Sequence, residues 1–100
     1  MLKSSQELQV GQFVKSRAGR DKGNVYIVYR IVDDRYVDVI DGDRRKLSNP
    51  KKKKVIHLVK IGDFDQTFQH ELMHQERLND AWIRKAILNQ VRLGRDDSNG

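Results

Sequence analysis

The stretch Gly19-Arg-Asp-Lys-Gly23 lies between two segments that are rich in β-forming residues. These segments are Val10-Gly-Gln-Phe-Val-Lys-Ser-Arg17 and Asn24-Val-Tyr-Ile-Val-Tyr-Arg-Ile-Val32. Two glycines four residues apart, with charged residues between them, are typical of a tight polar turn, because glycine adopts a positive φ without a steric cost. We therefore expect the turn to join two strands and to present Arg20 and Lys22 to solvent. The function is expected to lie here.

Two further strands are indicated downstream. Apolar residues alternate in Tyr36–Ile40, so that Val37 and Val39 face one way and their neighbours the other. Asp41-Gly42 is a hairpin signal, and it leads into a short fourth strand at Arg44–Ser48 that Asn49-Pro50 ends.

The pattern after the proline predicts a solvated loop at Lys51–Lys54 and a closing strand at Val55–Val59. Five short strands without a helical period favour a mainly β fold, because a small antiparallel sheet must curl into a barrel to hide its edges. The predicted core residues are Val10, Phe13, Val25, Ile27, Ile31, Val37, Val39, Leu47, Ile56 and Leu58.

Beyond Val59 the apolar spacing becomes helical. Phe64, Phe68 and Leu72 are four residues apart, which predicts a helix from about Gln66. Asn79-Asp80 offers an N-cap for a second helix, which carries an apolar stripe and ends near Gly94. The stripe consists of Ile83, Ile87 and Val91. The predicted divisions are a flexible N-terminus at 1–8, a barrel at 9–60, a helical extension at 61–94 and a flexible tail at 95–100.

Positive charge is concentrated in the first part of the chain. The 100 residues carry a formal net charge of +6, but residues 1–60 hold 15 basic and 7 acidic residues, whereas residues 61–100 hold 5 and 7. Such an excess favours an anionic partner, most often nucleic acid. The absence of cysteine excludes disulfides and thiolate metal sites. Without a long apolar run, we expect no membrane span, no signal peptide and a cytoplasmic location.

Val10–Val28 resembles the KOW motif of ribosomal proteins and NusG-type transcription factors, in which an apolar strand, a Gly-basic-Asp-Lys-Gly turn and a second apolar strand follow one another. Val39–Leu58 is similar to large-subunit ribosomal proteins of the L-fourteen-e type, with their Asp-Gly, Arg-Arg-Lys, Lys-rich and His-Leu arrangement. The short bacterial KOW-domain RNA-binding proteins share this arrangement. The resemblance covers residues 9–60 and extends less specifically to Leu78–Ala86.

This resemblance implies an SH3-like barrel that binds RNA, commonly ribosomal RNA, in translation or ribosome assembly. Basic loops provide affinity by neutralising phosphates and releasing counterions, so Arg20 and Lys22 could hold an RNA backbone from one side and Arg44-Arg-Lys46 from the other. Asp21 is expected to brace the turn. The candidate RNA-binding residues are Lys15, Arg17, Arg20, Lys22, Arg44, Arg45, Lys46, Lys51, Lys52, Lys53 and Lys54.

Aromatic residues in the predicted strands leave two roles open. Tyr26, Tyr29 and Tyr36 could stack on unpaired bases, but tyrosines in strands more often pack. Tyr36, beside the Asp33-Asp34 turn, is the one expected to be most exposed. Base-specific readout is not expected, so recognition should depend on RNA shape and backbone.

Two alternatives to RNA binding remain. The first is a protein-interaction adaptor associated with transcription or the ribosome, in which residues 61–94 contact a partner; packing of these helices on the barrel is the simpler expectation. The second is zinc-dependent hydrolysis by His70-Glu-Leu-Met-His74, a formal H-E-x-x-H motif on the first predicted helix. The extended form of that motif requires a glycine at 77 and a histidine at 80, where Arg77 and Asp80 stand. We therefore predict no catalytic residue, no metal, no cofactor and no enzymatic activity.

Overall fold

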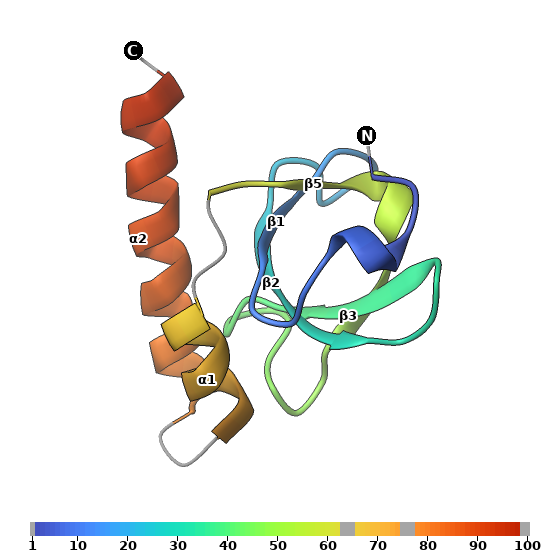
Figure 1. Ribbon diagram of the computed structural model, residues 1–100. Coiled ribbons are helices and arrows are strands. Elements are labelled where there is room, and N and C mark those ends of the chain that lie inside the picture. Colours follow the sequence, from blue (N-terminus) through green and yellow to red (C-terminus); the bar gives the residue numbers. More distant parts are fainter. Residues whose placement is uncertain (1, 63–65, 75–77, 99–100) are drawn as a thin grey trace.

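Five antiparallel strands form one sheet, with two helices after it in the chain (Figure 1). The computed structural model describes residues 2–62, 66–74 and 78–98, with side chains described as far as residue 92. The strand order is β4-β3-β2-β1-β5, and every neighbouring pair is antiparallel. The strands are β1 (Phe13–Ser16), β2 (Val25–Ile31), β3 (Tyr36–Ile40), β4 (Lys51–Lys54) and β5 (Leu58–Lys60).

Each face of the sheet covers a core of its own. Because successive side chains of a strand point to opposite faces, Val37 and Val39 on β3 face one core and Ile40 faces the other. The first core, on the concave face, contains Leu2, Leu8, Val14, Tyr26, Val28, Val37, Val39, Val55 and Leu58. The second joins the sheet to the helices and contains Phe13, Ile27, Ile40, Leu72 and Ile83. This division explains why β2 is apolar on both faces.

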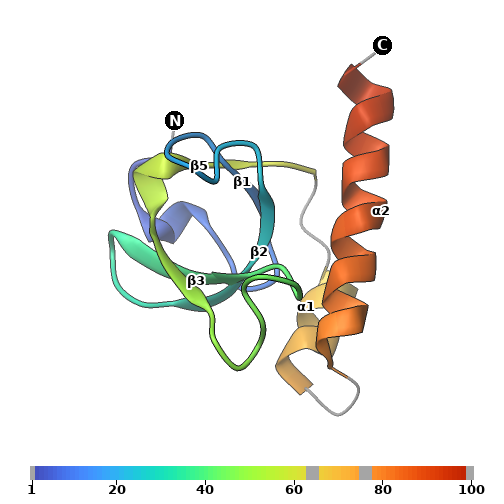
Figure 2. The same ribbon diagram turned by 180° about the vertical axis from the view of Figure 1, so that it is seen from behind.

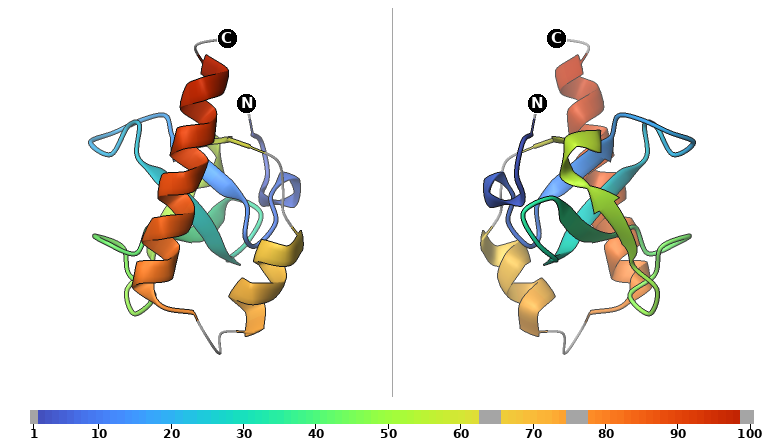
Figure 3. Two further views of the ribbon diagram at one scale, coloured as in Figure 1. Left: turned by 90° about the vertical axis from the view of Figure 1, so that its left-hand side faces the viewer. Right: turned by 90° about the vertical axis from the view of Figure 1, so that its right-hand side faces the viewer.

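The helices α1 (Gln66–His74) and α2 (Asp80–Ser98) lie beside the sheet, as Figures 2 and 3 show from other sides. The predicted N-cap is confirmed, because the Asn79 side-chain oxygen accepts a hydrogen bond from the Trp82 backbone N–H at 2.8 Å. The Phe68 ring lies 5.1 Å from the Phe13 ring and 4.9 Å from that of Trp82. Leu72 and Ile83 are buried against the sheet, so the apolar stripes pack within the chain as expected.

The described residues of the N-terminal segment, for which a flexible stretch at 1–8 was expected, pack against the sheet. A short 3₁₀ helix at Ser5–Glu7 begins with a capping box between Ser4 and Glu7. The Ser5 backbone N–H donates to the Asp34 carbonyl oxygen at 2.8 Å. Leu8 is buried on the concave face, so this segment closes one side of the first core.

The region from residue 44 to residue 60 differs from the prediction. Arg44–Ser48 is a loop, and the fourth strand is the run Lys51–Lys54, which was expected to be a solvated loop. Val55–His57 forms a 3₁₀ helix, and the closing strand is reduced to Leu58–Lys60. The prediction failed because lysine has a low strand propensity in isolation, whereas pairing with β3 decides the conformation here.

Two smaller corrections concern the core and the chain end. Ile31 and Ile56 are 38% and 46% exposed, so they are not core residues. Helix α2 continues through Gly94 to Ser98, into the predicted flexible tail, since a glycine within a helix costs only about 1 kcal/mol. Phe64 and residues 99–100 lie outside the described residues. Among the described helices, none combines the length and the apolar character needed to cross a membrane.

The buried N-terminal segment gives a stability prediction. Leu8→Ala should lower the free energy of unfolding by about 2–4 kcal/mol, because the removed methyl groups leave a cavity in the first core. Gln9→Ala, at an exposed neighbouring position, should change it by less than about 0.5 kcal/mol. Urea denaturation of both variants measures the difference. Equal values would show that the segment does not contribute to the core.

Candidate nucleic-acid interface

The turn between β1 and β2 is held by its own backbone. Gly19 and Gly23 have φ values of 82° and 92°, which confirms the expected need for glycine. The Gly23 N–H donates to the Ser16 carbonyl oxygen at 2.8 Å, and the Asn24 N–H donates to that of Asp21 at 2.9 Å. Nothing lies within 4 Å of a Cβ built on Gly23, so its backbone conformation, not crowding, requires glycine.

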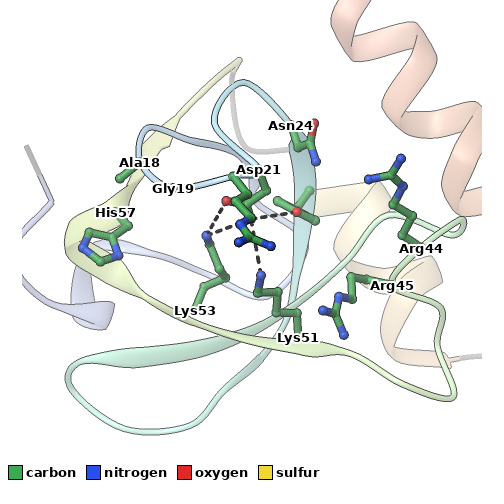
Figure 4. Close-up of a pocket in the computed structure, with 11 residues that line it drawn as sticks. Ala18, Gly19, Asp21, Asn24, Arg44, Arg45, Lys51, Lys53 and His57 are labelled. Atoms are coloured by element: carbon green, nitrogen blue, oxygen red, sulfur yellow. Dashed lines mark hydrogen bonds and ion pairs between the residues drawn. The ribbon is translucent and has the colours of Figure 1, made fainter.

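Asp21 connects this turn to the rest of the sheet (Figure 4). Its carboxylate accepts hydrogen bonds from Ser16 Oγ at 3.0 Å and from the Tyr26 hydroxyl at 2.9 Å. Lys53 Nζ on β4 donates to both carboxylate oxygens, at 2.8 and 3.0 Å. The Asp21 and Lys53 side chains are only 14% and 8% exposed. As expected, Asp21 braces the turn, and it does so against the edge strand.

Several neighbours determine the ionisation of this group. Partial burial opposes the charged form of Asp21, but hydrogen bonds from Lys53, Tyr26 and Ser16 outweigh it and hold the pKa of Asp21 well below its usual range. Burial, together with the nearby Asp21 carboxylate, raises the pKa of Tyr26. Asp21 is therefore an anion and Tyr26 a neutral hydrogen-bond donor at neutral pH.

A pocket of about 680 Å³ lies between the turn and the loop that follows β3. Arg20 from the turn and Arg44 and Arg45 from the loop line the same pocket, so the two predicted cationic clusters meet there. Figure 4 shows Arg44 and Arg45 across the pocket from the turn. The other lining residues are Ala18, Gly19, Asp21, Asn24, Tyr26, Lys51, Lys53 and His57. Sequence reasoning did not identify Asn24 and His57, which carry no motif of their own.

Helix α2 fixes the loop that carries the two arginines. The Asp80 carboxylate accepts a hydrogen bond from the Leu47 N–H at 2.9 Å, and the Arg84 guanidinium donates to the Gly42 carbonyl oxygen. A Cβ at Gly42 would collide with the Asp80 carbonyl oxygen, so the helix approaches the loop as closely as only glycine allows. Within the loop, the Asp41 carboxylate accepts hydrogen bonds from the N–H groups of Asp43 and Arg45, both at 2.8 Å.

The four lysines of β4 do not form one flexible cationic patch. Lys51 and Lys53 point toward Asp21, with Lys51 Nζ 3.7 Å from its carboxylate. Lys52 and Lys54 point to the opposite face, as alternation along a strand requires. Lys53 is buried and lies on a strand, so the prediction that it belongs to a solvated loop is wrong.

The remaining predicted cations lie outside the pocket. Lys15, Arg17, Lys22 and Lys46 are exposed but do not line it. Lys15 lies on β1, and the Arg17 N–H donates to the His57 carbonyl oxygen at 2.8 Å. The structure therefore unites Arg20 with Arg44 and Arg45, and leaves Lys22 and Lys46 at the periphery.

The tyrosines have separate environments. Tyr26 is buried, so it is a core residue and not a stacking surface. Tyr29 is partly buried against the second core, with the Arg30 guanidinium 5.6 Å from its ring centre. Tyr36 is partly exposed, and Lys52 Nζ lies 5.2 Å from its ring centre.

The H-E-x-x-H motif lies on α1 with both histidines exposed. The centres of the two imidazole rings are 3.8 Å apart, and His74 Nδ1 lies 2.9 Å from the His70 carbonyl oxygen. Asp80, the conceivable third ligand, instead binds the Leu47 N–H. The part of the chain that the structure describes contains no group of three or more His, Cys, Asp or Glu side chains that could hold a metal ion.

Comparison with known proteins does not assign the chain to a family. No family model matches it, and no curated protein is significantly similar to it.

The Asp21 cluster predicts a specific acid dependence of stability. Asp21→Asn should lower the free energy of unfolding near neutral pH by about 3 kcal/mol, because Lys53 would then be buried without its counter-charge. The carboxylate contributes stability above its unfolded-state pKa of about 4 and loses it as pH falls toward the lower folded-state value. The difference between wild type and variant should therefore shrink below about pH 4.

Urea denaturation between pH 7 and pH 2.5 measures this dependence. Asp43→Asn removes the same charge from an exposed position and serves as the control. A difference between wild type and Asp21→Asn that stays constant across this range would contradict the assignment of the shifted group to Asp21.

Proposed function

We propose that the chain binds RNA by holding a phosphate backbone in the pocket between the Gly19–Gly23 turn and the loop after β3. The observation that carries the proposal is the convergence of Arg20, Arg44 and Arg45 on one pocket. These arginines come from segments that are more than twenty residues apart in the chain. A cluster that the fold assembles from separate loops is better support for binding than a run of neighbouring cations.

The charge balance in the pocket favours a polyanion. Five cationic side chains line it against the single carboxylate of Asp21, which Lys53 already neutralises. Within the described part of the chain, none of the three arginines takes part in an ion pair. Their guanidinium groups are thus available for paired hydrogen bonds to phosphate oxygens.

The arrangement also supports the KOW resemblance. We propose that the curved five-stranded sheet is an SH3-like barrel of the KOW type, with the glycine turn between its first two strands. The RNA is then a structured one, of which ribosomal RNA is the expected class, and the process is translation or ribosome assembly. Arginines and lysines on loops recognise backbone and shape, so affinity should depend little on base sequence.

The adaptor alternative has less support. The apolar residues that an adaptor would offer to a partner include Leu72 and Ile83, and both are buried against the sheet. The contacts of Asp80 and Arg84 with the arginine loop give α2 a positioning role instead.

Salt dependence tests the proposed contacts. Arg44→Gln/Arg45→Gln should weaken binding to a structured ribosomal RNA fragment and lower the slope of log affinity against log salt by about two, since two phosphate contacts are lost. Lys85→Gln/Arg92→Gln removes the same charge from exposed positions of α2 and should leave the slope nearly unchanged. Equal slopes for the two double variants, measured by fluorescence anisotropy at several salt concentrations, would refute the pocket as the RNA site.

The positioning role of α2 gives a prediction opposite in sign to simple electrostatics. Asp80→Ala removes a negative charge, which alone would strengthen RNA binding. It also frees the Leu47 N–H and loosens the arginine loop, so we expect affinity to fall several-fold. Asp43→Ala, which removes an exposed carboxylate from the same loop, should raise affinity slightly. Anisotropy titrations, with thermal melting to verify folding, compare the two; higher affinity for both would exclude positioning by α2.

A further inference from the structure

The outer face of β4 carries two cations, Lys52 and Lys54, that do not line the arginine pocket. Lys52 and Lys54 alternate with Lys51 and Lys53, so they project on the side of the sheet away from Asp21. In the strand register Tyr36 lies opposite Lys54, and Asp38 lies opposite Lys52. Tyr36 and both lysines therefore share one face.

Tyr36 and Lys54 also line another cavity, of about 280 Å³, where β4 runs into the 3₁₀ helix Val55–His57. Its polar lining includes Lys3 from the N-terminal segment, Arg35 from the turn before β3, and Lys54. Tyr36, Val55 and Ile56 complete it, and Ile56 is 46% exposed. The Val55 N–H donates to the Arg35 carbonyl oxygen at 2.8 Å, which ties the two sides of the cavity together.

The charged residues that line this cavity are all basic, namely Lys3, Arg35 and Lys54. Two carboxylates lie close to it: Asp33 accepts hydrogen bonds from the backbone N–H groups of Arg35 and Tyr36, and Glu7 accepts one from that of Lys3. Asp38 is the acidic side chain on the adjoining strand, and the Arg30 guanidinium lies 3.9 Å from its carboxylate. Within the described residues, none of the cations around Tyr36 forms an ion pair, so they remain available to an external anion. Proteins that bind single-stranded nucleic acid combine an aromatic ring with nearby cations and apolar surface. The bases stack on the ring, and the cations contact the phosphates.

We propose that Lys3, Arg35, Tyr36, Lys52, Lys54 and Ile56, here termed the Tyr36 face, form a second RNA contact that takes unpaired nucleotides. One base stacks on the Tyr36 ring, and Lys52 and Lys54 hold the flanking phosphates. The inference rests on the proposed function for its ligand class, but it concerns a separate surface. Because β4 is an edge strand of the sheet, a single RNA strand that leaves the arginine pocket can pass over this edge and reach the Tyr36 face.

Lys52 has a defined part in this contact. In the free protein its ammonium group lies over the Tyr36 ring, 5.2 Å from the ring centre. An exposed cation–π contact of this kind is weaker than the stacking of a base on a ring, so an incoming base displaces the ammonium group. The displaced lysine then remains close to the nucleotide's phosphate.

The proposal is tested by comparing the binding of two RNAs: a single-stranded oligouridylate of about twelve nucleotides and a stable hairpin stem. Tyr36→Leu should weaken binding of the single strand about tenfold and leave binding of the stem unchanged, whereas Tyr36→Phe should keep both affinities. Lys52→Gln/Lys54→Gln, at two exposed positions, should lower the salt slope for the single strand by about 1.4. Thermal melting of each variant verifies that it is folded.

The outcomes separate this inference from the proposed function. If Tyr36→Leu and Lys52→Gln/Lys54→Gln both bind the single strand with wild-type affinity, the Tyr36 face is overturned and the arginine pocket is not. The same conclusion follows if Tyr36→Leu and Tyr36→Phe lose equal affinity for the single strand. Loss of stem binding on Arg44→Gln/Arg45→Gln, with single-strand binding retained, supports two distinct contacts. Failure of the wild-type protein to bind either RNA overturns both proposals. Tighter, Tyr36-dependent binding of a poly-glutamate peptide would assign the face to an acidic protein segment and overturn the RNA inference.

Discussion

The ion pair between Asp21 and Lys53 is the constraint on which the candidate site depends. It joins a turn near the start of the sheet to the edge strand β4, thirty-two residues later in the chain. Removing two charges from water is costly, and the cost is offset here because Ser16 and Tyr26 also donate to the carboxylate. The pair fixes the distance between the turn and β4. The position of Arg20 relative to Lys51 follows from it.

Local sequence patterns were sufficient to predict those elements whose structure depends on neighbouring residues. The alternation in Tyr36–Ile40, the glycine turn and the Asn79 cap were all predicted correctly, because each depends on residues a few positions apart. The strand at Lys51–Lys54 could not be predicted in this way. Four lysines form a strand here because β3 lies beside them and because Asp21 pairs with Lys51 and Lys53. Neither partner is near the lysines in sequence.

The candidate site was predictable in its parts but not in its assembly. The charge pattern identified the turn and the Arg44-Arg45 cluster, and the fold brings them to one pocket. No sequence signal indicated that α2 would hold the arginine loop through Asp80 and Arg84, since that contact requires the close approach at Gly42. The sequence predicts only a helical extension, yet α2 supports the loop that supplies two of the three arginines in the pocket.

The alternation of β4 explains why one run of four identical residues can serve two surfaces. Side chains repeat every second residue, so a slip of one residue in the pairing with β3 would exchange the faces of all four lysines. After such a slip, Lys52 or Lys54 would take the place of Lys53 beside Asp21. Four identical residues therefore cannot define the register by themselves. The register is therefore fixed from outside, by the Val55 N–H bonded to the Arg35 carbonyl oxygen at one end of the strand. Burial of Val55 in the first core strengthens this, because a slip would force it toward solvent at the cost of its apolar contacts.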